Sequence, residues 1–265
     1  MPLNIRDLEQ HSNIAELLNE EQLSTIGSTL LQSVKYDLES RAGWERNNDQ
    51  WMKLAEQVVE AKSFPWPNAS NIKFPILNTA AIQFHSRAYA ALLGNRNFVL
   101  AKTLGKDPKG TKAARARRVA EFMSMQLLDV MDGWQDDMDR LLFLLPIIGI
   151  VYKKTYYNAS RQIKVSDIVH PRDIIINYHA RDYDTARMTH RLHLNSNSIH
   201  EHIAAGLFLA IEDSEQAKTS ISVEGVRDKA QGLSNSGLVD ELTPTILYEV
   251  HDWLDLDEDG YREPY

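Results

Sequence analysis

Apolar residues recur at steps of three and four positions from about Glu20 to Ala61, which predicts one long helix with a single apolar stripe. The stripe consists of Leu23, Ile26, Leu30, Val34, Leu38, Trp44, Trp51, Leu54 and Val58. A helix of about 40 residues would be about 60 Å long, which exceeds the usual globular length and makes a break near Gly43 plausible. A stripe of this length needs a second surface to cover it, from this chain or from another subunit.

Three more helices are predicted before residue 149. They cover residues 77–93, 112–134 and 136–145, and a strand over residues 98–104 precedes the second of them. One side of the helix over 112–134 is expected to face inward, and it carries Val119, Phe122, Met123, Gln126, Leu127, Val130, Met131 and Trp134.

The character of the chain changes at Gly149, after which β-branched and aromatic runs alternate with turn residues. Strands are predicted over 151–157, 162–169, 173–178, 188–194 and 245–253, with a short helix over 198–205 and a loop with one weak helix over 211–240. Because helices come first and mostly antiparallel strands follow, the fold class is predicted to be α+β.

This order divides the chain into three expected segments: a long helical segment over 1–62, a proline-rich strap with a helical core over 63–147, and a β-rich region over 148–265. The last predicted strand has no partner unless more chain follows. We therefore expect the sequence to be the front part of a longer protein.

The strap is the run Ser63-Phe-Pro-Trp-Pro-Asn-Ala-Ser-Asn-Ile-Lys-Phe-Pro75. Its prolines prevent a continuous helix and bias the residues before them toward extended backbone. A solvated linker would be polar, whereas this segment carries Phe64, Trp66 and Phe74. These three side chains are therefore expected to pack on apolar surface, in the core of the chain or between subunits.

The amino-acid composition limits the classes of function that the protein can have. The 265 residues carry a net charge of −8 and no cysteine, which excludes disulfides and cysteine-based metal or redox sites. A protein that mainly grips DNA phosphates would be basic, whereas an acidic surface suits a conduit through which DNA slides. The most apolar run, residues 141–151, is too short to span a bilayer. The sequence has no catalytic signature of the hydrolase, metalloprotease or dinucleotide-binding type, so we expect a protein that is not an enzyme.

The one concentrated basic stretch is residues 102–118, where seven Lys and Arg residues stand against Asp107 alone. Two hypotheses remain open: Lys112, Arg115 and Arg118 contact nucleic acid or an acidic partner, or they form a solvated helix face. No aromatic residues interleave, which argues against base stacking. The run from Gly105 to Lys112 imitates a phosphate-binding loop, but its order Gly-Thr-Lys exchanges the lysine and the hydroxyl, so a nucleotide-hydrolysing site is the weaker alternative.

Asp255, Asp257 and Asp259, followed by Gly260, match the first half of an EF-hand calcium loop. The bidentate acid of such a loop would fall at position 266, and the preceding residues 247–253 are typical of a strand rather than a helix. Calcium is the one cofactor that the sequence suggests, and a calcium-binding adaptor is the alternative function. The competing interpretation is an acidic β-hairpin with Asp-Gly at its turn.

Several stretches together, in similar order, resemble one family of portal proteins from tailed bacteriophages. They are Trp51-Met-Lys-Leu-Ala55, the strap with Leu77, Phe84-His-Ser-Arg-Ala-Tyr89, Leu144-Leu-Pro-Ile-Ile-Gly149 with Tyr152-Lys-Lys-Thr-Tyr156, Val169-His-Pro-Arg-Asp173 with Asn177-Tyr178, and Leu254-Asp-Leu-Asp-Glu-Asp-Gly-Tyr-Arg-Glu-Pro-Tyr265. Members of this family are much longer, so the resemblance implies the outer wing region and the approach to the stem.

The resemblance implies a structural, non-enzymatic subunit of a dodecameric ring at one vertex of the capsid, through which DNA is packaged and ejected. Its partners would be further copies of the chain, the terminase, capsid and head-completion proteins, and the passing double-stranded DNA, with no membrane. Its location would be the virion and, during assembly, the host cytoplasm. Heterologous contacts around such a ring can bury both the helix stripe and the strap.

Overall fold

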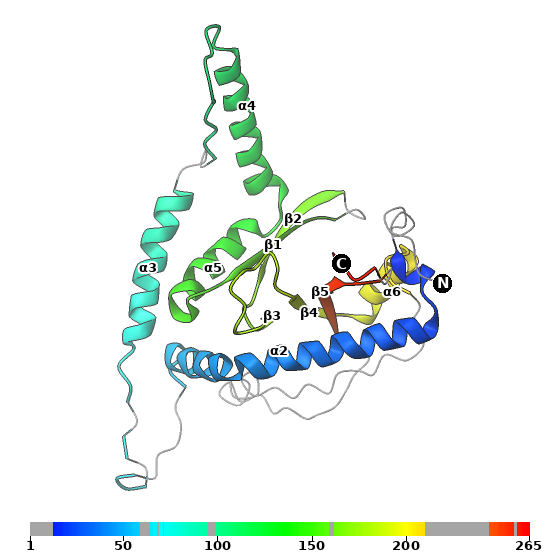
Figure 1. Ribbon diagram of the computed structural model, residues 1–265. Helices are drawn as coiled ribbons and strands as arrows, with labels where there is room; N and C mark the ends of the chain where they lie inside the picture. Colours follow the sequence, from blue (N-terminus) through cyan, green and yellow to red (C-terminus); the bar gives the residue numbers. More distant parts are fainter. Residues whose placement is uncertain are drawn as a thin grey trace. The chain divides into compact units, whose positions relative to one another are not determined.

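The computed structural model describes residues 13–58, 64–67, 69–70, 72–94, 99–158, 162–209, 244–256 and 259–265. Helices come first along the chain: η1 (Ile14–Leu17), α2 (Glu20–Ala55), α3 (Ile76–Leu93), α4 (Thr111–Met125), η2 (Gln126–Val130) and α5 (Trp134–Ile148). They are followed by β1 (Tyr152–Asn158), β2 (Ile163–Val169), β3 (Ile174–Ile176), β4 (Met188–Leu194), α6 (Ser196–Ala204), β5 (Thr245–His251), β6 (Trp253–Leu254) and β7 (Glu263–Pro264) (Figure 1). Every pairing between these strands is antiparallel, which confirms the predicted α+β class.

The long helix α2 begins at a reciprocal cap. The Asn19 side chain accepts a hydrogen bond from the Gln22 amide at 2.8 Å, and the Gln22 side chain accepts one from the Asn19 amide at 3.1 Å. The helix then continues to Ala55 without interruption, so the break considered near Gly43 is wrong. Gly43 lies in open space within the helix, where a glycine costs only about 0.5–1 kcal/mol relative to alanine and does not end it.

The contacts of the chain divide it into two compact units, which are described separately. Unit 1 consists of Met1–Asn47 and Arg172–Tyr265, and unit 2 consists of Asn48–Pro171. Each unit therefore contains both helix and sheet. The three contiguous segments expected from the sequence stay a prediction.

Unit 1 contains a three-stranded sheet in the order β3-β4-β5. The longest pairing, β4 with β5, runs from Met188 opposite His251 to Leu194 opposite Thr245. The core of the unit is formed by the buried residues Val34, Ile174, Ile175, Thr189, Ile199 and Thr245. The expectation that the strand over 245–253 lacks a partner is wrong, because β5 pairs with β4 and β6 pairs with β7 in a hairpin.

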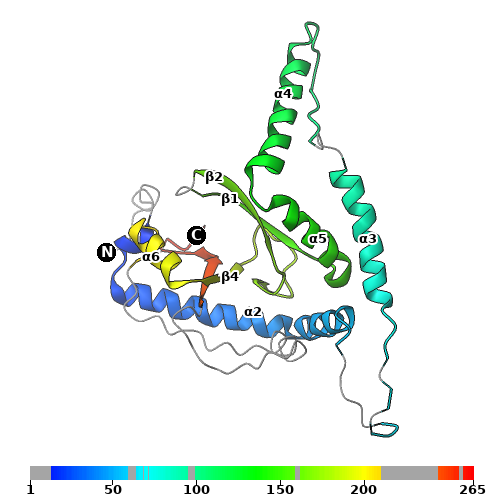
Figure 2. The same ribbon diagram turned by 180° about the vertical axis from the view of Figure 1, so that it is seen from behind.

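Unit 2 is built on α3, α5 and the β1–β2 hairpin (Figure 2). Helices α3 and α5 pack along each other, and two polar contacts join them: His85 Nε2 to Asp139 Oδ1 at 2.7 Å, and Gln135 Nε2 to the Tyr89 hydroxyl at 2.6 Å. Helix α5 also packs on β2, where the Ile168 amide donates to the Asp137 carboxylate at 2.9 Å. The buried apolar residues of this unit are Ala55, Ala81, Leu142, Ile147, Ile148 and Val169.

Two boundaries in unit 2 differ from the expectation. Helix α5 continues through Pro146 and ends at Gly149, whose backbone has φ of 87° and whose amide bonds the Leu145 carbonyl. Proline removes one hydrogen bond but leaves the turn before it intact, so the helix gains one more apolar turn with the buried Ile147 and Ile148. The strand over 98–104 is also wrong for its described part, since residues 99–104 form no ladder.

Candidate interaction surface on helix α4

A groove lies between helix α4 and the extended segment 99–104, which runs beside it. It has a volume of about 340 Å³ and is lined by Val99, Leu100, Ala101, Thr103, Ala113, Ala116, Arg117, Ala120 and Glu121. Ala113, Ala116 and Ala120 are spaced by three and four residues and therefore share one face of the helix. Their small side chains allow the extended segment to approach, and the Val99 amide donates to the buried Ser124 hydroxyl at 3.4 Å.

The N-terminal end of α4 is closed by a carboxylate. Gly110 adopts the left-handed conformation with φ of 66°, and one Asp107 carboxylate oxygen accepts a hydrogen bond from the Ala113 amide at 2.9 Å. A phosphate-binding loop offers these helix amides to a phosphate. Here a negatively charged side chain already satisfies one of them and would repel a second anion, so the geometry argues against the nucleotide-hydrolysing alternative.

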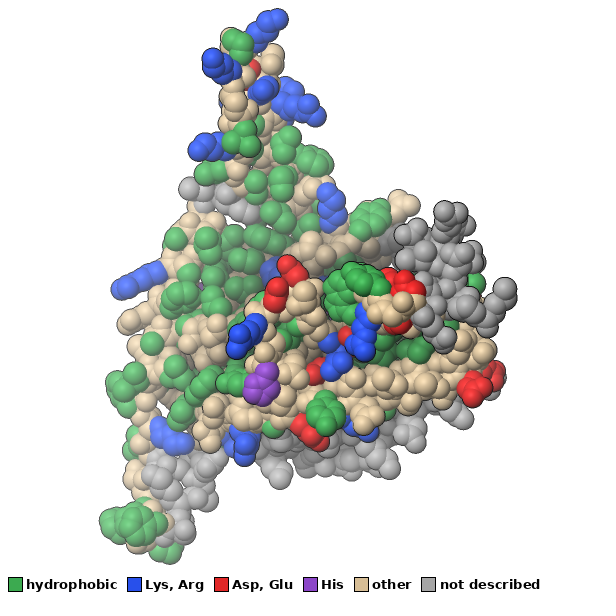
Figure 3. Space-filling view, in the orientation of Figure 1, with side chains coloured by type: hydrophobic (Ala, Val, Ile, Leu, Met, Phe, Trp, Pro, Cys, Tyr) green, Lys and Arg blue, Asp and Glu red, His purple; other side chains and the backbone are tan. Residues whose placement is uncertain are grey.

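The basic residues predicted as contacts are all exposed on α4. Lys112, Arg115 and Arg118 face solvent, and no other side chain in the part of the chain that the structure describes forms an ion pair with them. Arg117, between them, is already paired with Glu121 at 2.9 Å. Figure 3 shows Lys and Arg side chains gathered at this end of α4, with apolar side chains farther along it.

The apolar side of α4 is exposed rather than buried. The prediction that this side faces inward is wrong for Val119, Phe122, Met123 and Val130, all of which are about half exposed or more. The helical pattern itself is correct, but the α-helix ends at Met125 and continues directly as the π turn η2. Among the residues that the structure describes, no element covers these apolar side chains.

The aromatic residues of the strap are also exposed. Phe64, Trp66 and Phe74 are 82%, 65% and 81% exposed, and the neighbouring Ile72 is exposed as well. The expectation that they pack in the core of the chain is therefore wrong, whereas packing between subunits stays a prediction. In the described part of the chain, no element covers these side chains.

The acidic run near residue 260 forms a hairpin turn. The two Asp255 carboxylate oxygens accept hydrogen bonds from the Asp259 amide at 3.2 Å and the Gly260 amide at 3.0 Å. The Asp259 carboxylate accepts one from the Tyr261 amide at 2.7 Å, and Gly260 has φ of 89°. This confirms the β-hairpin interpretation. Asp257 lies outside the described residues, so calcium binding through Asp255, Asp257 and Asp259 stays a prediction.

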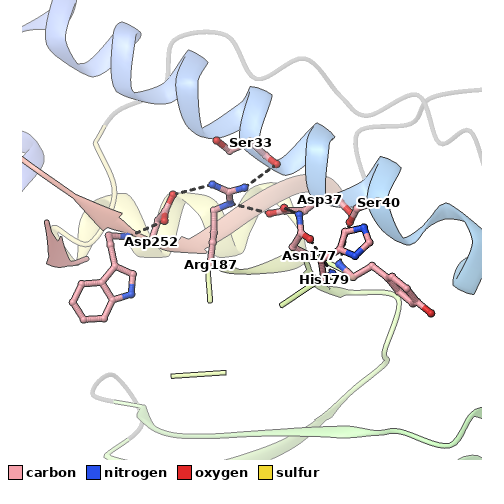
Figure 4. Close-up of polar contacts among 9 residues, drawn as sticks. Ser33, Asp37, Ser40, Asn177, His179, Arg187 and Asp252 are labelled. Atoms are coloured by element: carbon pink, nitrogen blue, oxygen red, sulfur yellow. Dashed lines mark hydrogen bonds and ion pairs between the residues drawn. The ribbon is translucent and has the colours of Figure 1, made fainter. Parts of the chain in front are cut away.

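A buried ionic cluster in unit 1 escaped the sequence analysis. Arg187 donates to Asp37 at 2.8 Å, to Asp252 at 3.3 Å and to the Ser33 carbonyl at 3.3 Å (Figure 4). Asn177 donates to the other Asp37 oxygen at 2.9 Å, and Asp37 is fully buried. The hydrogen bond with Asp37 is the largest of the effects that raise the pKa of Arg187, which burial alone would lower.

A second arginine, one helical turn after Asp37 on α2, makes a similar set of contacts. Arg41 is buried, donates to the Ile174 carbonyl and to the Arg172 carbonyl at 3.1 Å, and pairs with Glu45 at 2.8 Å. Val34, Asp37 and Arg41 follow one another at steps of three and four residues, so they share the helix face that lies against the sheet. Charged residues on an otherwise apolar helix face are the signal that could have predicted this cluster. The cluster holds α2 against the other elements of unit 1.

Comparison with known proteins adds no family. No protein-family model matches the chain, and no curated protein matches it. Among the described residues, no helix is long and apolar enough to cross a bilayer, and no group of three or more metal-ligating side chains is gathered. The basic end of α4 and the aromatic strap are two surfaces of the described part that remain candidates for contact with another molecule.

Proposed function

We propose that this chain is a structural subunit of a portal ring through which double-stranded DNA passes. The observation that carries the proposal is the exposure of the strap, with Phe64, Trp66 and Phe74 in water in the single chain. The resemblance of the strap and of the other stretches named above to portal proteins supports the same reading.

The energetics of the strap favour an assembly. Isolated exposed apolar residues are normal, but neighbouring aromatics on one segment mark a contact with another molecule. Burying three side chains of this size is worth on the order of 10 kcal/mol before the cost of association is subtracted. A gain of this size is best explained by a permanent contact with another molecule. In a ring of identical subunits, the neighbouring copy of the chain provides that contact at every position.

The net charge of the chain favours a channel through which DNA moves over a protein that grips DNA. The net charge of −8 repels a polyanion overall, which suits DNA that moves past without being held. Seven of the 29 basic residues stand in the stretch 102–118, and four of these seven lie on α4. This distribution fits a subunit in the wall of a DNA channel, whose cations make a local contact.

Native mass spectrometry and electron microscopy of the whole chain over a range of concentrations test this proposal. The expected result is a discrete ring-shaped oligomer. The triple variant Phe64→Ser, Trp66→Ser, Phe74→Ser is expected to lower the oligomeric fraction at least about 10-fold without changing the unfolding of the monomer.

The matched control replaces exposed aromatics outside the strap, Tyr157→Ser with Tyr183→Ser, and is expected to assemble like the wild type. A wild-type chain that stays monomeric at every concentration contradicts the proposal. So does a strap variant that assembles as well as the control.

A further inference from the structure

The most exposed large apolar side chains of the described residues belong to two extended segments of unit 2. They are Phe64 (82% exposed), Ile72 (92%) and Phe74 (81%) in the strap, and Leu100 (90%) and Leu104 (84%) in segment 99–104. The strap precedes helix α3, and segment 99–104 follows it. Because all five side chains stay in water, neither segment covers the other within a single chain.

Segment 99–104 has the sequence of a strand but lacks a partner strand in the described part of the chain. Val99 and Thr103 are half-buried beside α4, whereas Leu100 and Leu104 are exposed. The backbone of residues 100–104 forms no hydrogen bond with any other residue that the structure describes. An apolar strand edge with free amides and carbonyls is a site to which a further strand can add.

The strap contains a run with the same properties. Its three prolines leave residues 68–74 free of proline, so each residue of that run keeps a backbone amide. Ile72 and Phe74 are two positions apart and share one face of an extended strand. Their amides have no acceptor among the described residues, and the Phe74 carbonyl accepts a hydrogen bond from the Ile76 amide at 2.9 Å. The strap therefore offers an apolar strand face with free donors.

The two segments also match in shape and in area. The groove between segment 99–104 and α4 has a volume of about 340 Å³, and no aromatic side chain is among the residues that line it. The three aromatics of the strap expose on the order of 450 Å² of apolar surface. A stable interface takes about 800 Å² from each partner, so these three side chains supply about half of one partner's share.

Helix α3 separates the two segments along the chain. Its 18 residues make it about 27 Å long. Each copy therefore presents a strap before one end of this helix and a free strand edge after the other end. This arrangement allows every copy to give its strap to one neighbour and to receive the strap of another.

We propose that the strap of one copy pairs as an added strand with segment 99–104 of the next copy, with Ile72 and Phe74 packed on Leu100 and Leu104. The other aromatics of the strap then cover the α4 groove. Because the two surfaces differ, the contact is heterologous and repeats around a closed ring. It rests on the proposed function, in which a neighbouring copy covers the strap, and it names the surface that does so.

A second copy fits this edge better than nucleic acid does. Phosphates would gain nothing from Leu100 and Leu104, which would stay in water. The strap brings both apolar side chains to cover these leucines and backbone groups to pair with the edge. It is also present in the same number as the edge in every assembly of this chain.

A proline substitution tests the backbone pairing. Lys102→Pro removes an amide from the middle of the edge and prevents a regular ladder there. It is expected to raise the dissociation constant for assembly at least about 10-fold, as read by native mass spectrometry. Lys102→Ser, the matched control, removes the same exposed side chain but keeps the amide, and is expected to assemble like the wild type.

A second variant tests the apolar contact. Leu100→Ser with Leu104→Ser is expected to weaken assembly by a similar factor, since both side chains would face Ile72 and Phe74 of the neighbouring copy. Its control is Tyr183→Ser with Leu207→Ser, which removes exposed apolar side chains from unit 1 and is expected to assemble normally. Thermal unfolding of dilute monomer is expected to stay unchanged in all these variants, because the replaced side chains are exposed.

Disulfide cross-linking identifies the two segments directly, because the chain has no cysteine of its own. Copies with Phe74→Cys are mixed with copies carrying Leu100→Cys or Leu104→Cys and oxidised with copper phenanthroline. Opposite Cα atoms of paired strands are about 4.5–5.5 Å apart, which a disulfide can bridge. Peptide mass spectrometry is expected to find the mixed disulfide with at least one of the two positions and none with Thr185→Cys.

The outcomes separate this contact from the ring. If the wild type forms rings and both edge variants assemble like their controls, the contact is overturned while the ring remains. A wild type that stays monomeric overturns both. Equal weakening by Lys102→Pro and Lys102→Ser would assign the contact to the lysine side chain instead of the strand edge. Disulfides between two copies of Leu100→Cys, without the mixed product, would show that two edges pair with each other, and the strap would not be the partner.

Discussion

Charged side chains play opposite parts in the two units of this protein. In unit 1, Arg187 and Asp37 are held together at 2.8 Å, and Asp37 is fully buried. In unit 2, Arg115 and Arg118 are exposed on α4 without partners among the residues that the structure describes. The first pair fixes how one chain folds, and the second pair is free to contact another molecule.

The same difference holds for apolar side chains. In unit 2, Leu142 of α5 is 3% exposed, whereas Phe122 of α4 is 53% exposed. Both residues fit a helical apolar pattern. Only the contacts of their helices distinguish a side chain that stabilises the fold from one that is available for assembly.

The largest expected effect concerns the buried cluster. Asp37→Ala leaves the half-buried Arg187 cation without its main partner, and removing one member of a buried pair costs about 3–5 kcal/mol of unfolding free energy. Urea unfolding followed by circular dichroism measures it. Glu39→Ala, at an exposed position of the same helix, is the control and is expected to change stability by less than about 0.5 kcal/mol. A loss below 1 kcal/mol for Asp37→Ala would mean that the cluster does not secure α2.

A second pair of variants compares the two helices of unit 2. Leu142→Ala opens a cavity in the core and is expected to cost about 2–5 kcal/mol, whereas Phe122→Ala is expected to cost less than about 1 kcal/mol. When assembly is measured by native mass spectrometry, Phe122→Ala is expected to have the larger effect of the two, because only the exposed side chain is available to a neighbouring copy. Equal destabilisation by both changes would show that α4 is covered within its own chain.

The smallest effect is a pH dependence in unit 2. The Lys153 ammonium lies 5.2 Å from the Trp134 ring centroid, and burial lowers the pKa of Lys153, although Asp137 and Asp167 partly raise it. The unfolded chain, with the ordinary pKa of 10.5, binds more protons between the folded pKa and 10.5, so stability rises with pH across that window. Lys153→Met removes the buried charge.

This variant is expected to be more stable than the wild type by up to about 1 kcal/mol at neutral pH, with the gain disappearing above a pH of about 10.5. Thermal unfolding at a series of pH values measures the gain. Lys164→Met, at an exposed position of the neighbouring strand, is expected to show no such trend. A gain that grows with pH would contradict the assigned cause.

Local patterns in the sequence predicted most of the fold. The three- and four-residue steps located α2, α3 and α5, and the β-branched runs located β1 to β5, whereas the short strand β7 was not predicted. The acidic hairpin was one of two interpretations of the Asp-Gly pair, beside a calcium loop. These features depend on neighbours along the chain, so a single sequence contains the information needed to find them.

What could not be predicted depends on contacts between distant residues or between molecules. Arg187 and Asp37 are 150 residues apart, and no local pattern links them. The apolar face of α4 has the same periodicity whether its own chain or a second copy covers it, so the assumption that it is covered internally was natural and wrong. For the strap the same limit left two interpretations open, packing in the core or between subunits, because composition shows that a segment is apolar but not what covers it.

The most direct test of the account asks whether assembly covers the strap. The chain has no cysteine, so Lys73→Cys introduces a single thiol beside the exposed Phe74. Thiol labelling is expected to be fast in dilute monomer and at least about 10-fold slower in assembled samples, while a thiol at Thr185→Cys is labelled equally fast in both. Equal labelling at position 73 in monomer and assembly would contradict the claim that copies of this chain bury one another's aromatic strap.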